Sequence, residues 1–393
     1  MNNYSKIYLD HSATTPMDGG VYDAMKPYFM EKFGNPASIH TVGQEGIVAV
    51  DESREKVADY LNCKTSEIIF TSGATESNNL AIKGVINASS VEKPHIITTS
   101  IEHLAVMETC KYLEKEGVEV TYLKVNRDGI INISELESSI KKSTILVSIM
   151  FANNEVGSIQ PIKKIGKLID KVNHERVEKI FFHTDAVQAI QYLDCRPKIY
   201  NIDLLSLSAH KFYGPKGVGV LYVKNGTKID KIQHGGHQEY NKRAGTLNVP
   251  GIVGLGKAIE NISKDQKGMY QNSAKLKLRF INKIKNNIPD VYINGSVEKS
   301  LPNIVNIRFD KIEGESILLS LDFAGVAVST GSACTSGTLE PSHVLLAMGV
   351  AKEKAHGSIR FSLGKDNTTN EIDKVLEILS NIVKKLRKMS PIK

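Results

Sequence analysis

Two charged residues stand directly after apolar stretches that are typical of buried strands. Asp185 ends "FFHTD", and Lys211 follows "LLSLSAH". A lysine that is partly desolvated at a strand end has a lowered pKa, so its amine can attack an aldehyde. A carboxylate can keep a pyridine nitrogen protonated, so the two residues together suit a pyridoxal phosphate site. Taken singly, Lys211 reads as a solvated turn lysine and Asp185 as the N-cap of a following helix.

A third stretch has the pattern of a phosphate cradle. "FTSGATESNNLAIKG", residues 70–84, runs from a strand through Ser-Gly-Ala-Thr into a helical pattern. Backbone N–H groups and the Thr75 hydroxyl would meet an anion there, at the N-terminus of a helix. The chain contains no GxxxxGK[ST], and the glycines at 251, 254 and 256 do not space as GxGxxG. These absences disfavour a nucleotide-binding fold.

One cysteine differs from the other three in its surroundings. Cys334 lies in "VSTGSACTSGTLEPSH", residues 328–343, among Gly, Ser and Thr rather than apolar neighbours. A thiolate is a nucleophile, and its pKa and exposure decide its reactivity. A Gly/Ser/Thr-rich loop suits a cysteine that carries a group from one site to another. The remaining cysteines, which show neither CxxC nor metal-ligand spacing with it, are expected to be structural: Cys63, Cys110 and Cys195.

The elements that must position these residues form a regular alternation over the first 260 residues. Short β-rich runs alternate with amphipathic stretches, which predicts an α/β fold with a mostly parallel sheet flanked by helices. In such sheets ligands bind at the carboxyl ends of the strands, where Asp185 and Lys211 stand. The expected strands are 67–70, 95–98, 118–123, 144–150, 179–184, 204–208 and 218–223.

The pattern changes after about residue 260. A Lys-rich helical stretch is followed by short strands and by a final helix that Thr368 and Glu371 would begin as a capping box. We therefore expect a large α/β domain and a smaller α+β domain that carries the Cys334 loop. The large domain would comprise residues 15–260, and the small one residues 1–14 and 261–393.

Composition sets bounds on the class of protein. Hydrophobic residues make up 41% of the chain and charged residues 24%, as in globular proteins with a large core. The most apolar window, residues 143–152, is too short to cross a bilayer, and the N-terminal stretch lacks the pattern of a secretory signal. A net charge of +7 over 393 residues is mild. We expect a cytoplasmic protein without a membrane or a direct nucleic-acid partner.

Taken together, the motifs resemble those of the cysteine desulfurases, the NifS/IscS type within the class V aminotransferases, which supply sulfur for iron–sulfur clusters. The resemblance covers nearly the whole chain and implies pyridoxal phosphate as cofactor. It also implies that the expected α/β domain is the large domain of a pyridoxal phosphate-dependent transferase, aspartate aminotransferase-like. The matching strings occur in the family's order: "YLDHSATTPMD", "GNPASIH", "TSGATESNNLAIKG", "EHLAVMET", "NNEVGSIQPI", "HTDAVQA", "SLSAHKFYGPKGVG", "RAGTLNVPGIVG", "STGSACTSGTLEPSHVLLAMG" and "GSIRFSLG".

The resemblance implies a role for each matched residue at the cofactor. Lys211 would bind the cofactor aldehyde covalently, and Asp185 would pair with the ring nitrogen. Gln188 would bond the phenolic oxygen. His103 would stack on the ring and act in catalysis as a proton shuttle, although a histidine at that position also reads as a helix start. The phosphate would be held by Ala74, Thr75, Ser208 and His210, with Thr246 reaching in from the second subunit of a homodimer.

The resemblance also implies the substrate and the fate of its sulfur. Arg360 would bind the carboxylate of L-cysteine, with Asn154 nearby, although a buried structural arginine is the alternative for Arg360. Cys334 would take the sulfur as a persulfide, release alanine, and pass the sulfur to an iron–sulfur scaffold or a thiolation protein. Other functions on the same fold are a selenocysteine lyase, another class V lyase or aminotransferase, and a non-enzymatic sulfur-transfer scaffold.

One stretch departs from the family's usual sequence. In "HGGHQEYNKRAGT", residues 234–246, the family has glycine in place of His237 and Arg-Gly in place of Tyr240 and Asn241. If this loop crosses a dimer interface near the site, its bulk would alter access or partner choice. His234 and His237 have no acidic or thiol residues beside them, so we expect no metal site there.

Overall fold

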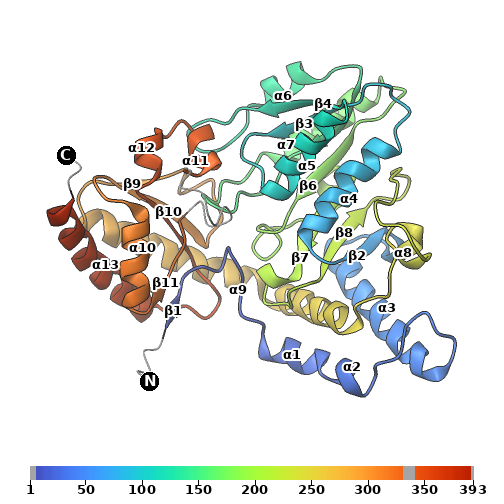
Figure 1. The fold of residues 1–393 in the computed structure, drawn as a ribbon, viewed down its shortest axis with the longest axis horizontal. Coiled ribbons are helices and arrows are strands. Elements are labelled where there is room, and N and C mark those ends of the chain that lie inside the picture. The colour runs from blue at the N-terminus through green and yellow to red at the C-terminus, as the bar shows by residue number, and fades with distance from the viewer. Residues whose placement is uncertain (1–5, 331–340, 391–393) are drawn as a thin grey trace.

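The computed structural model describes residues 6–330 and 341–390. The expected nucleophile Cys334 lies outside these described residues. The described chain forms a larger and a smaller body, which share one long helix (Figure 1). No helix of the described ranges is long and apolar enough to span a membrane.

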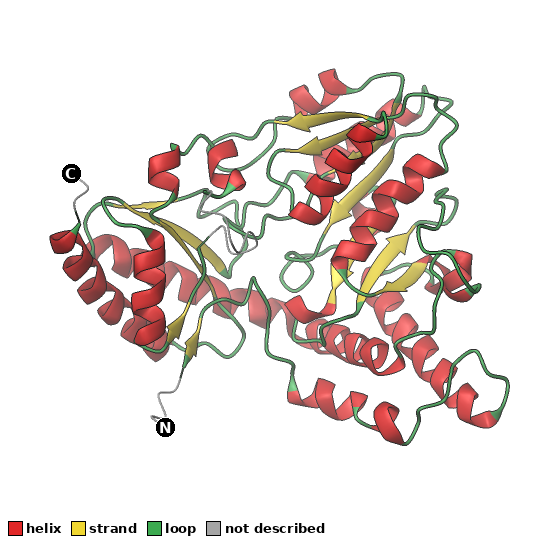
Figure 2. Ribbon diagram, viewed as in Figure 1, coloured by secondary structure: helices red, strands yellow, loops and turns green. Residues whose placement is uncertain are grey.

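A seven-stranded sheet forms the centre of the larger body (Figure 2). One strand runs antiparallel to both its neighbours, and all other neighbouring pairs are parallel. Every expected strand is present, and the predicted fold class is confirmed. In spatial order the strands are β2 (Ile68–Thr71), the antiparallel β8 (Gly219–Val223), β7 (Leu204–Ser208), β6 (Phe181–Asp185), β5 (Thr144–Ser148), β3 (His95–Thr99) and β4 (Glu119–Leu123).

Helices cover both faces of this sheet, and this explains why its strands are apolar at successive positions. Ile96 and Leu146 pack on one face, while their chain neighbours Ile97 and Val147 pack on the other. The first face is covered by α4 (Ala74–Asn87) and α5 (Leu104–Lys115); the second by α3 (Thr41–Leu61), α6 (Ile133–Ser139), α7 (Ile162–Asn173) and the first half of α9 (Val249–Asn287).

The smaller body contains a three-stranded antiparallel sheet and a separate parallel pair of strands. Its last helix begins with the expected capping box, in which Thr368 and Glu371 each bond the other's backbone N–H. The elements are β12 (Ser358–Ser362), β10 (Ile304–Phe309) and β9 (Val291–Ile293) in the sheet, β1 (Ile7–Tyr8) and β11 (Val326–Ala327) in the pair, and the helices α10 (Gly314–Phe323) and α13 (Thr369–Met389).

The long helix α9 belongs to both hydrophobic cores. Ile259 and Ile262 pack in the core of the larger body, whereas Leu276 and Phe280 pack in that of the smaller one. Between them, Asp265 departs from helical geometry, with φ −145° and ψ 31°. The domain boundary expected at 260 falls inside this helix.

Short elements complete the described chain. The segment after β1 passes from the smaller body to the larger, because Leu9 lies in the smaller core while Thr15 pairs with the backbone of His210. The short elements are α1 (Gly19–Met25), α2 (Pro27–Met30), α8 (Gln238–Asn241), α11 (His343–Ala347), α12 (Lys352–Ala355), and the 3₁₀ turns η1 (Thr65–Glu67), η2 (Pro197–Tyr200) and η3 (Ala209–Lys211).

Candidate active site

A pocket of about 580 Å³ opens at the carboxyl ends of β5, β6 and β7. Residues of both bodies line this pocket: Lys211 belongs to the larger body and Arg360 to the smaller body. Of the expected site residues, Thr246 lines a different pocket and Cys334 lies outside the described residues. The other ten line this pocket together: Ala74, Thr75, His103, Asn154, Asp185, Gln188, Ser208, His210, Lys211 and Arg360.

The expected phosphate cradle is the junction of β2 and α4. Gly73 caps the helix with φ 150°, a conformation that residues with a side chain rarely adopt. A side chain at the neighbouring Gly219 would also meet the Gly73 backbone at 2.7 Å. The two glycines therefore bring the backbone of the helix N-terminus into the pocket, where Ala74 and Thr75 lie. Such a helix end attracts an anion.

Asp185 ends β6 and is held in place by two donors. The Asn78 side-chain amide of α4 donates to its Oδ2 at 2.7 Å, and the Val187 N–H donates to its Oδ1 at 3.0 Å. The residues that follow form a turn rather than a helix. Asp185 thus caps a turn and also lines the pocket, so its local role does not compete with a role at a cofactor.

Lys211 follows β7, and its amine meets the N-terminal segment. Its Nζ donates to the carbonyl oxygens of Ser12 and Ala13, each at 2.7 Å. Gln188 donates to the same Ser12 carbonyl at 3.1 Å. Residues 10–15 belong to the matching string "YLDHSATTPMD", but no local pattern in that string predicts this contact. They form the wall against which the lysine rests.

His103 caps α5 and lines the pocket at the same time. Its Nδ1 accepts the Ala105 N–H at 3.1 Å, which places the proton of a neutral ring on Nε2. Burial lowers the pKa of His103; the charge of Asp185 opposes this shift, and Lys211 lowers the pKa further. The histidine is therefore both a helix start, as the alternative held, and a neutral aromatic ring at the pocket.

Glu102, next to His103, was not singled out in the sequence. Its Oε1 accepts from the Thr99 hydroxyl at 2.8 Å and from the Met150 N–H at 2.9 Å. Burial raises the pKa of Glu102 to about 8. Glutamates are mostly exposed in proteins, and nothing in the surrounding "SIEHLAV" marks this one as buried.

Arg360 projects from β12 and is almost fully buried, with 4% of its surface exposed. Its Nη1 donates to the Asn154 carbonyl at 3.0 Å, and its Nη2 pairs with the Asp10 carboxylate at 2.9 Å. Its buried Nε has no hydrogen-bond partner among residues 6–330 and 341–390. A carboxylate bound in the pocket would satisfy this donor.

The described residues on both sides of 331–340 contact residues that line the pocket or are chain neighbours of such residues. The backbone of Ser329 pairs with that of Arg360, at 2.7 and 3.2 Å. On the other side, the Ser342 hydroxyl donates to the Glu155 carboxylate at 2.5 Å, and the His343 Nε2 bonds the Glu102 carbonyl at 2.9 Å. The segment that contains Cys334 therefore leaves and rejoins the described fold next to residues that line the pocket.

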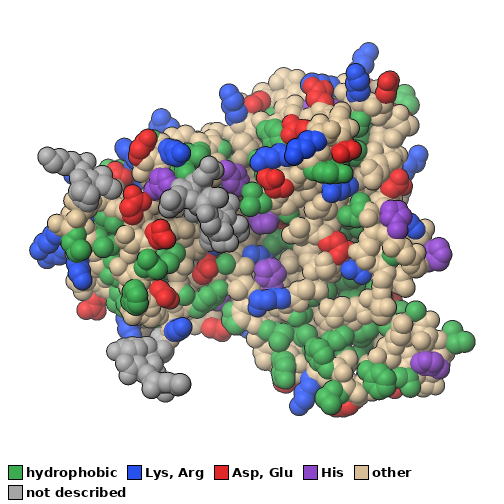
Figure 3. All heavy atoms as spheres, in the orientation of Figure 1, with side chains coloured by type: hydrophobic (Ala, Val, Ile, Leu, Met, Phe, Trp, Pro, Cys, Tyr) green, Lys and Arg blue, Asp and Glu red, His purple; other side chains and the backbone are tan. Residues whose placement is uncertain are grey.

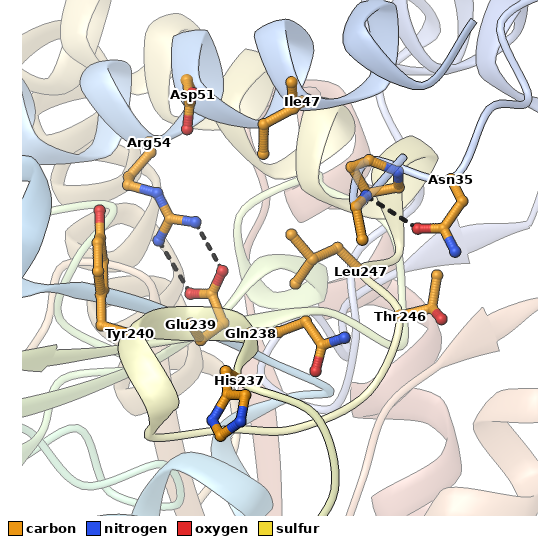
Figure 4. Close-up of a pocket in the computed structure, with 12 residues that line it drawn as sticks. Asn35, Ile47, Asp51, Arg54, His237, Gln238, Glu239, Tyr240, Thr246 and Leu247 are labelled. Atoms are coloured by element: carbon orange, nitrogen blue, oxygen red, sulfur yellow. Dashed lines mark hydrogen bonds and ion pairs between the residues drawn. The ribbon is translucent and has the colours of Figure 1, made fainter. Parts of the chain in front are cut away.

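The remaining expected residue, Thr246, lines a second pocket of about 400 Å³ (Figure 4). In the same pocket Arg54 forms a bidentate ion pair with Glu239, at 2.6 and 2.9 Å. Glu239, Tyr240 and Asn241 all have φ between 45° and 62°, so three successive side-chain-bearing residues are left-handed. The departures from the family at 240 and 241 thus fall on strained backbone.

The donor set in the first pocket fits pyridoxal phosphate. A lysine amine can bind its aldehyde, a buried aspartate can pair with its ring nitrogen, and a helix N-terminus can hold its phosphate. No cluster of three or more metal-ligating side chains was found in the described part of the chain.

Comparisons with known proteins give a consistent family. Residues 7–375 match the model of the family described as Aminotransferase class-V. The chain is 52% identical to "Cysteine desulfurase IscS" of Dictyoglomus turgidum over 388 residues, which is 99% of this chain and 97% of the relative. A solved structure titled "NIFS-LIKE PROTEIN" matches with a TM-score of 0.91 and 40% identity, covering 97% of this chain and 100% of the other. Another, titled "SspA in complex with cysteine", matches with a TM-score of 0.81 and 38% identity, covering 91% and 99%.

Proposed function

The chain belongs to the class-V aminotransferase family, and from that premise we propose that the pocket around Lys211 is its active site. It is a pyridoxal phosphate-dependent cysteine desulfurase, which removes sulfur from L-cysteine and yields L-alanine. The observation that carries the proposal is the convergence of Lys211 and Asp185, which stand at the carboxyl ends of neighbouring parallel strands and line one pocket. The roles of the individual residues follow from their contacts.

Four residues would hold the cofactor ring. Lys211 binds the aldehyde, Asp185 pairs with the ring nitrogen, Gln188 bonds the phenolic oxygen, and His103 stacks on the ring face. Asn78 supports this arrangement, because its amide holds one oxygen of Asp185 and leaves the carboxylate in the pocket. The residues for the phosphate are Ala74, Thr75, Ser208 and His210.

The bound cofactor supplies an electron sink that weakens the bonds around the substrate's Cα and allows its C–S bond to break. The protein supplies acids, bases and orientation. The Lys211 amine, when it is not bonded to the cofactor, would take the Cα proton; the Ser12 and Ala13 carbonyls can accept its N–H groups. The guanidinium of Arg360 binds the substrate carboxylate, with Asn154 beside it, and so fixes the direction of the Cα–H bond.

Cys334 would be the sulfur acceptor. Its thiolate attacks the substrate's sulfur, an S–S bond forms as the C–S bond breaks, and the electron pair of that bond remains with the carbon. Protonation of this carbon then yields alanine, and the protein holds a persulfide. The positions of Ser329 and Ser342 support this role, because Ser329 pairs with the pocket residue Arg360 and Ser342 bonds Glu155, the chain neighbour of the pocket residue Asn154.

A homodimer would complete the site. Thr246 lines the second pocket rather than that of Lys211, so within one chain it is not placed to contact the phosphate. Hydrophobic side chains gather on the face formed by α1, α2 and the start of α3, at the lower right of Figure 3. Those more than half exposed include Tyr22, Phe29, Met30, Phe33 and Ile39. A second copy of the chain would cover this face and bring Thr246 to its partner's pocket.

The acceptor of the sulfur would be a protein of iron–sulfur cluster assembly or of thiolation. The names of the IscS relatives support the first of these, and the second remains a different outcome of the same chemistry. We place the reaction in the cytoplasm, since the chain combines a reactive cysteine with three further free cysteines that form no disulfide among the described residues.

Two variants test the proposal. Purified holoenzyme should be yellow, and Lys211→Ala should abolish the visible absorbance of the bound cofactor. Cys334→Ala should keep that absorbance but lose nearly all release of alanine and sulfide from L-cysteine in the presence of a reductant. Mass spectrometry after cysteine treatment should find one extra sulfur on the peptide containing Cys334.

The control is Cys63→Ala, because burial raises the pKa of Cys63 to about 12 and keeps its thiol unreactive. Full turnover of Cys334→Ala would refute the persulfide role. Comparison of L-cysteine with L-selenocysteine as substrates decides between the desulfurase and a selenocysteine lyase.

A further inference from the structure

The N-terminal segment places a carboxylate against Arg360, a residue that lines the pocket. Asp10 follows β1, and its backbone bridges to Ser362 at the end of β12. The Tyr8 hydroxyl donates to the carbonyl oxygens of Asp10 and Thr14, at 3.0 and 2.9 Å. These contacts fix the backbone of Asp10 at both sides. Its carboxylate then meets Arg360, which stands 350 residues later in the chain.

The Arg360 and Asp10 side chains differ in their exposed fraction and in whether they line the pocket. The Arg360 side chain is 5% exposed and lines the pocket, whereas the Asp10 side chain is 19% exposed and does not line it. A guanidinium buried to this degree requires partners for its charge. Asp10 supplies the charged partner, and the Asn154 carbonyl supplies a neutral one.

The donors of Arg360 can be counted. A guanidinium has five N–H groups. One on Nη1 goes to the Asn154 carbonyl, and one on Nη2 goes to Asp10. The Nε–H is buried and has no partner within the two described ranges of the chain. Two contacts thus fix the plane of the guanidinium, and its Nε–H is left unpaired within these ranges.

From this geometry we infer that Asp10 is a positioning residue for substrate binding. It holds Arg360 so that the Nε–H and a remaining N–H group are presented to the carboxylate of the amino acid. This inference rests on the proposed function, in which Arg360 binds that carboxylate. Asp10 itself does not touch the substrate; it acts through the orientation of the arginine.

The test separates recognition of the carboxylate from the rest of the site. Holoenzyme is titrated with L-alanine and, separately, with ethylamine, and binding is followed by the change in cofactor absorbance. Ethylamine has the amine but lacks the carboxylate. Asp10→Ala should weaken binding of L-alanine about tenfold and leave binding of ethylamine unchanged, because only the first ligand uses Arg360.

The conservative variant Asp10→Asn tests whether Asp10 acts by orienting the Arg360 guanidinium or by its negative charge. Asp10→Asn keeps an oxygen that can accept from Nη2, so its affinity for L-alanine should stay within about threefold of the wild type. In steady-state turnover of L-cysteine, Asp10→Ala should raise KM more than it lowers kcat. Cofactor absorbance without ligand should be the same in all these proteins.

The matched control is Asp373→Ala. Asp373 also pairs with an arginine, Arg279, but on the surface of the smaller body, and its loss should change neither titration. A further variant, Arg360→Ala, decides how normal L-alanine binding by Asp10→Ala is interpreted. If Arg360→Ala binds L-alanine normally, the proposed role of the arginine fails, and that of Asp10 fails with it. If Arg360→Ala is impaired but Asp10→Ala binds L-alanine normally or more tightly, the inference about Asp10 alone is overturned.

Discussion

Replacement of Glu239 by alanine should destabilise the protein more than any surface change. The Glu239 carboxylate accepts from both terminal nitrogens of Arg54 (Figure 4). It also accepts from the Phe70 N–H, at 2.7 Å. Its side chain is 1% exposed, and that of Arg54 is 6% exposed. Arg54 also stacks over the rings of Phe70 and Tyr240. One carboxylate thus connects α8, α3 and β2.

The expected magnitude follows from what Glu239→Ala leaves behind. Removal of one partner of a buried ion pair costs about 3–5 kcal/mol, because the other charge stays buried without compensation. The Phe70 N–H also loses its acceptor, which costs roughly 1–3 kcal/mol. Since these effects are not additive, we expect a loss of about 4 kcal/mol, a large part of the usual 5–15 kcal/mol of native stability.

The assay is urea unfolding of the holoenzyme at fixed protein concentration, with the free energy extrapolated from the transition. The matched control is Glu108→Ala, which removes an exposed ion pair with Lys111 and should cost less than about 1 kcal/mol. The double variant Arg54→Met with Glu239→Leu should be more stable than Glu239→Ala, because it leaves no buried charge. A loss below about 1 kcal/mol in Glu239→Ala would refute the reasoning.

Two further changes test the burial of single groups. Because the folded-state pKa of Glu102 is raised from 4.5 to about 8, its stabilising effect is complete below pH 4.5 and is lost as the pH rises through 8. The difference in unfolding free energy, Glu102→Gln minus wild type, should therefore increase by on the order of 5 kcal/mol from pH 4.5 to pH 8. Urea titrations at several pH values measure this difference. A difference that stays constant with pH would contradict the prediction. Gly166→Ala should destabilise the folded protein by at least about 2 kcal/mol, because its new methyl group would lie 1.7 Å from the Tyr200 carbonyl oxygen. The control is Gly19→Ala, whose methyl group would have nothing within 4 Å and should leave the thermal midpoint unchanged or slightly raised.

The sequence predicted those parts of the fold and site that depend on local pattern. The strands of the larger body follow from continuous apolar runs, which a sheet buried on both faces requires. Asp185 and Lys211 follow from their position at strand ends, and the final helix from the capping box of Thr368 and Glu371. In each case the signal lies within a few consecutive residues.

The missed residues act through contacts between distant parts of the chain. Asp10 meets Arg360 across 350 positions, and Glu239 meets Arg54 across 185. Ser342 and Glu155 form a similar long-range bond. No periodicity links such partners, because each lies in an unremarkable local pattern, and only the packing of complete elements brings them together. The string that contains Asp10 was noticed as a motif, but its contacts could not be read from it.

The helix α9 makes the two bodies a single mechanical piece. Cutting the chain near residue 260 would divide this helix and would separate Ile262 from the larger core in which it packs. Asp265 departs from helical geometry, so a rotation of one core against the other would bend the helix at this position. Lys211 and Arg360 belong to different bodies, so such a bend would change the distance between the Lys211 amine and the Arg360 guanidinium.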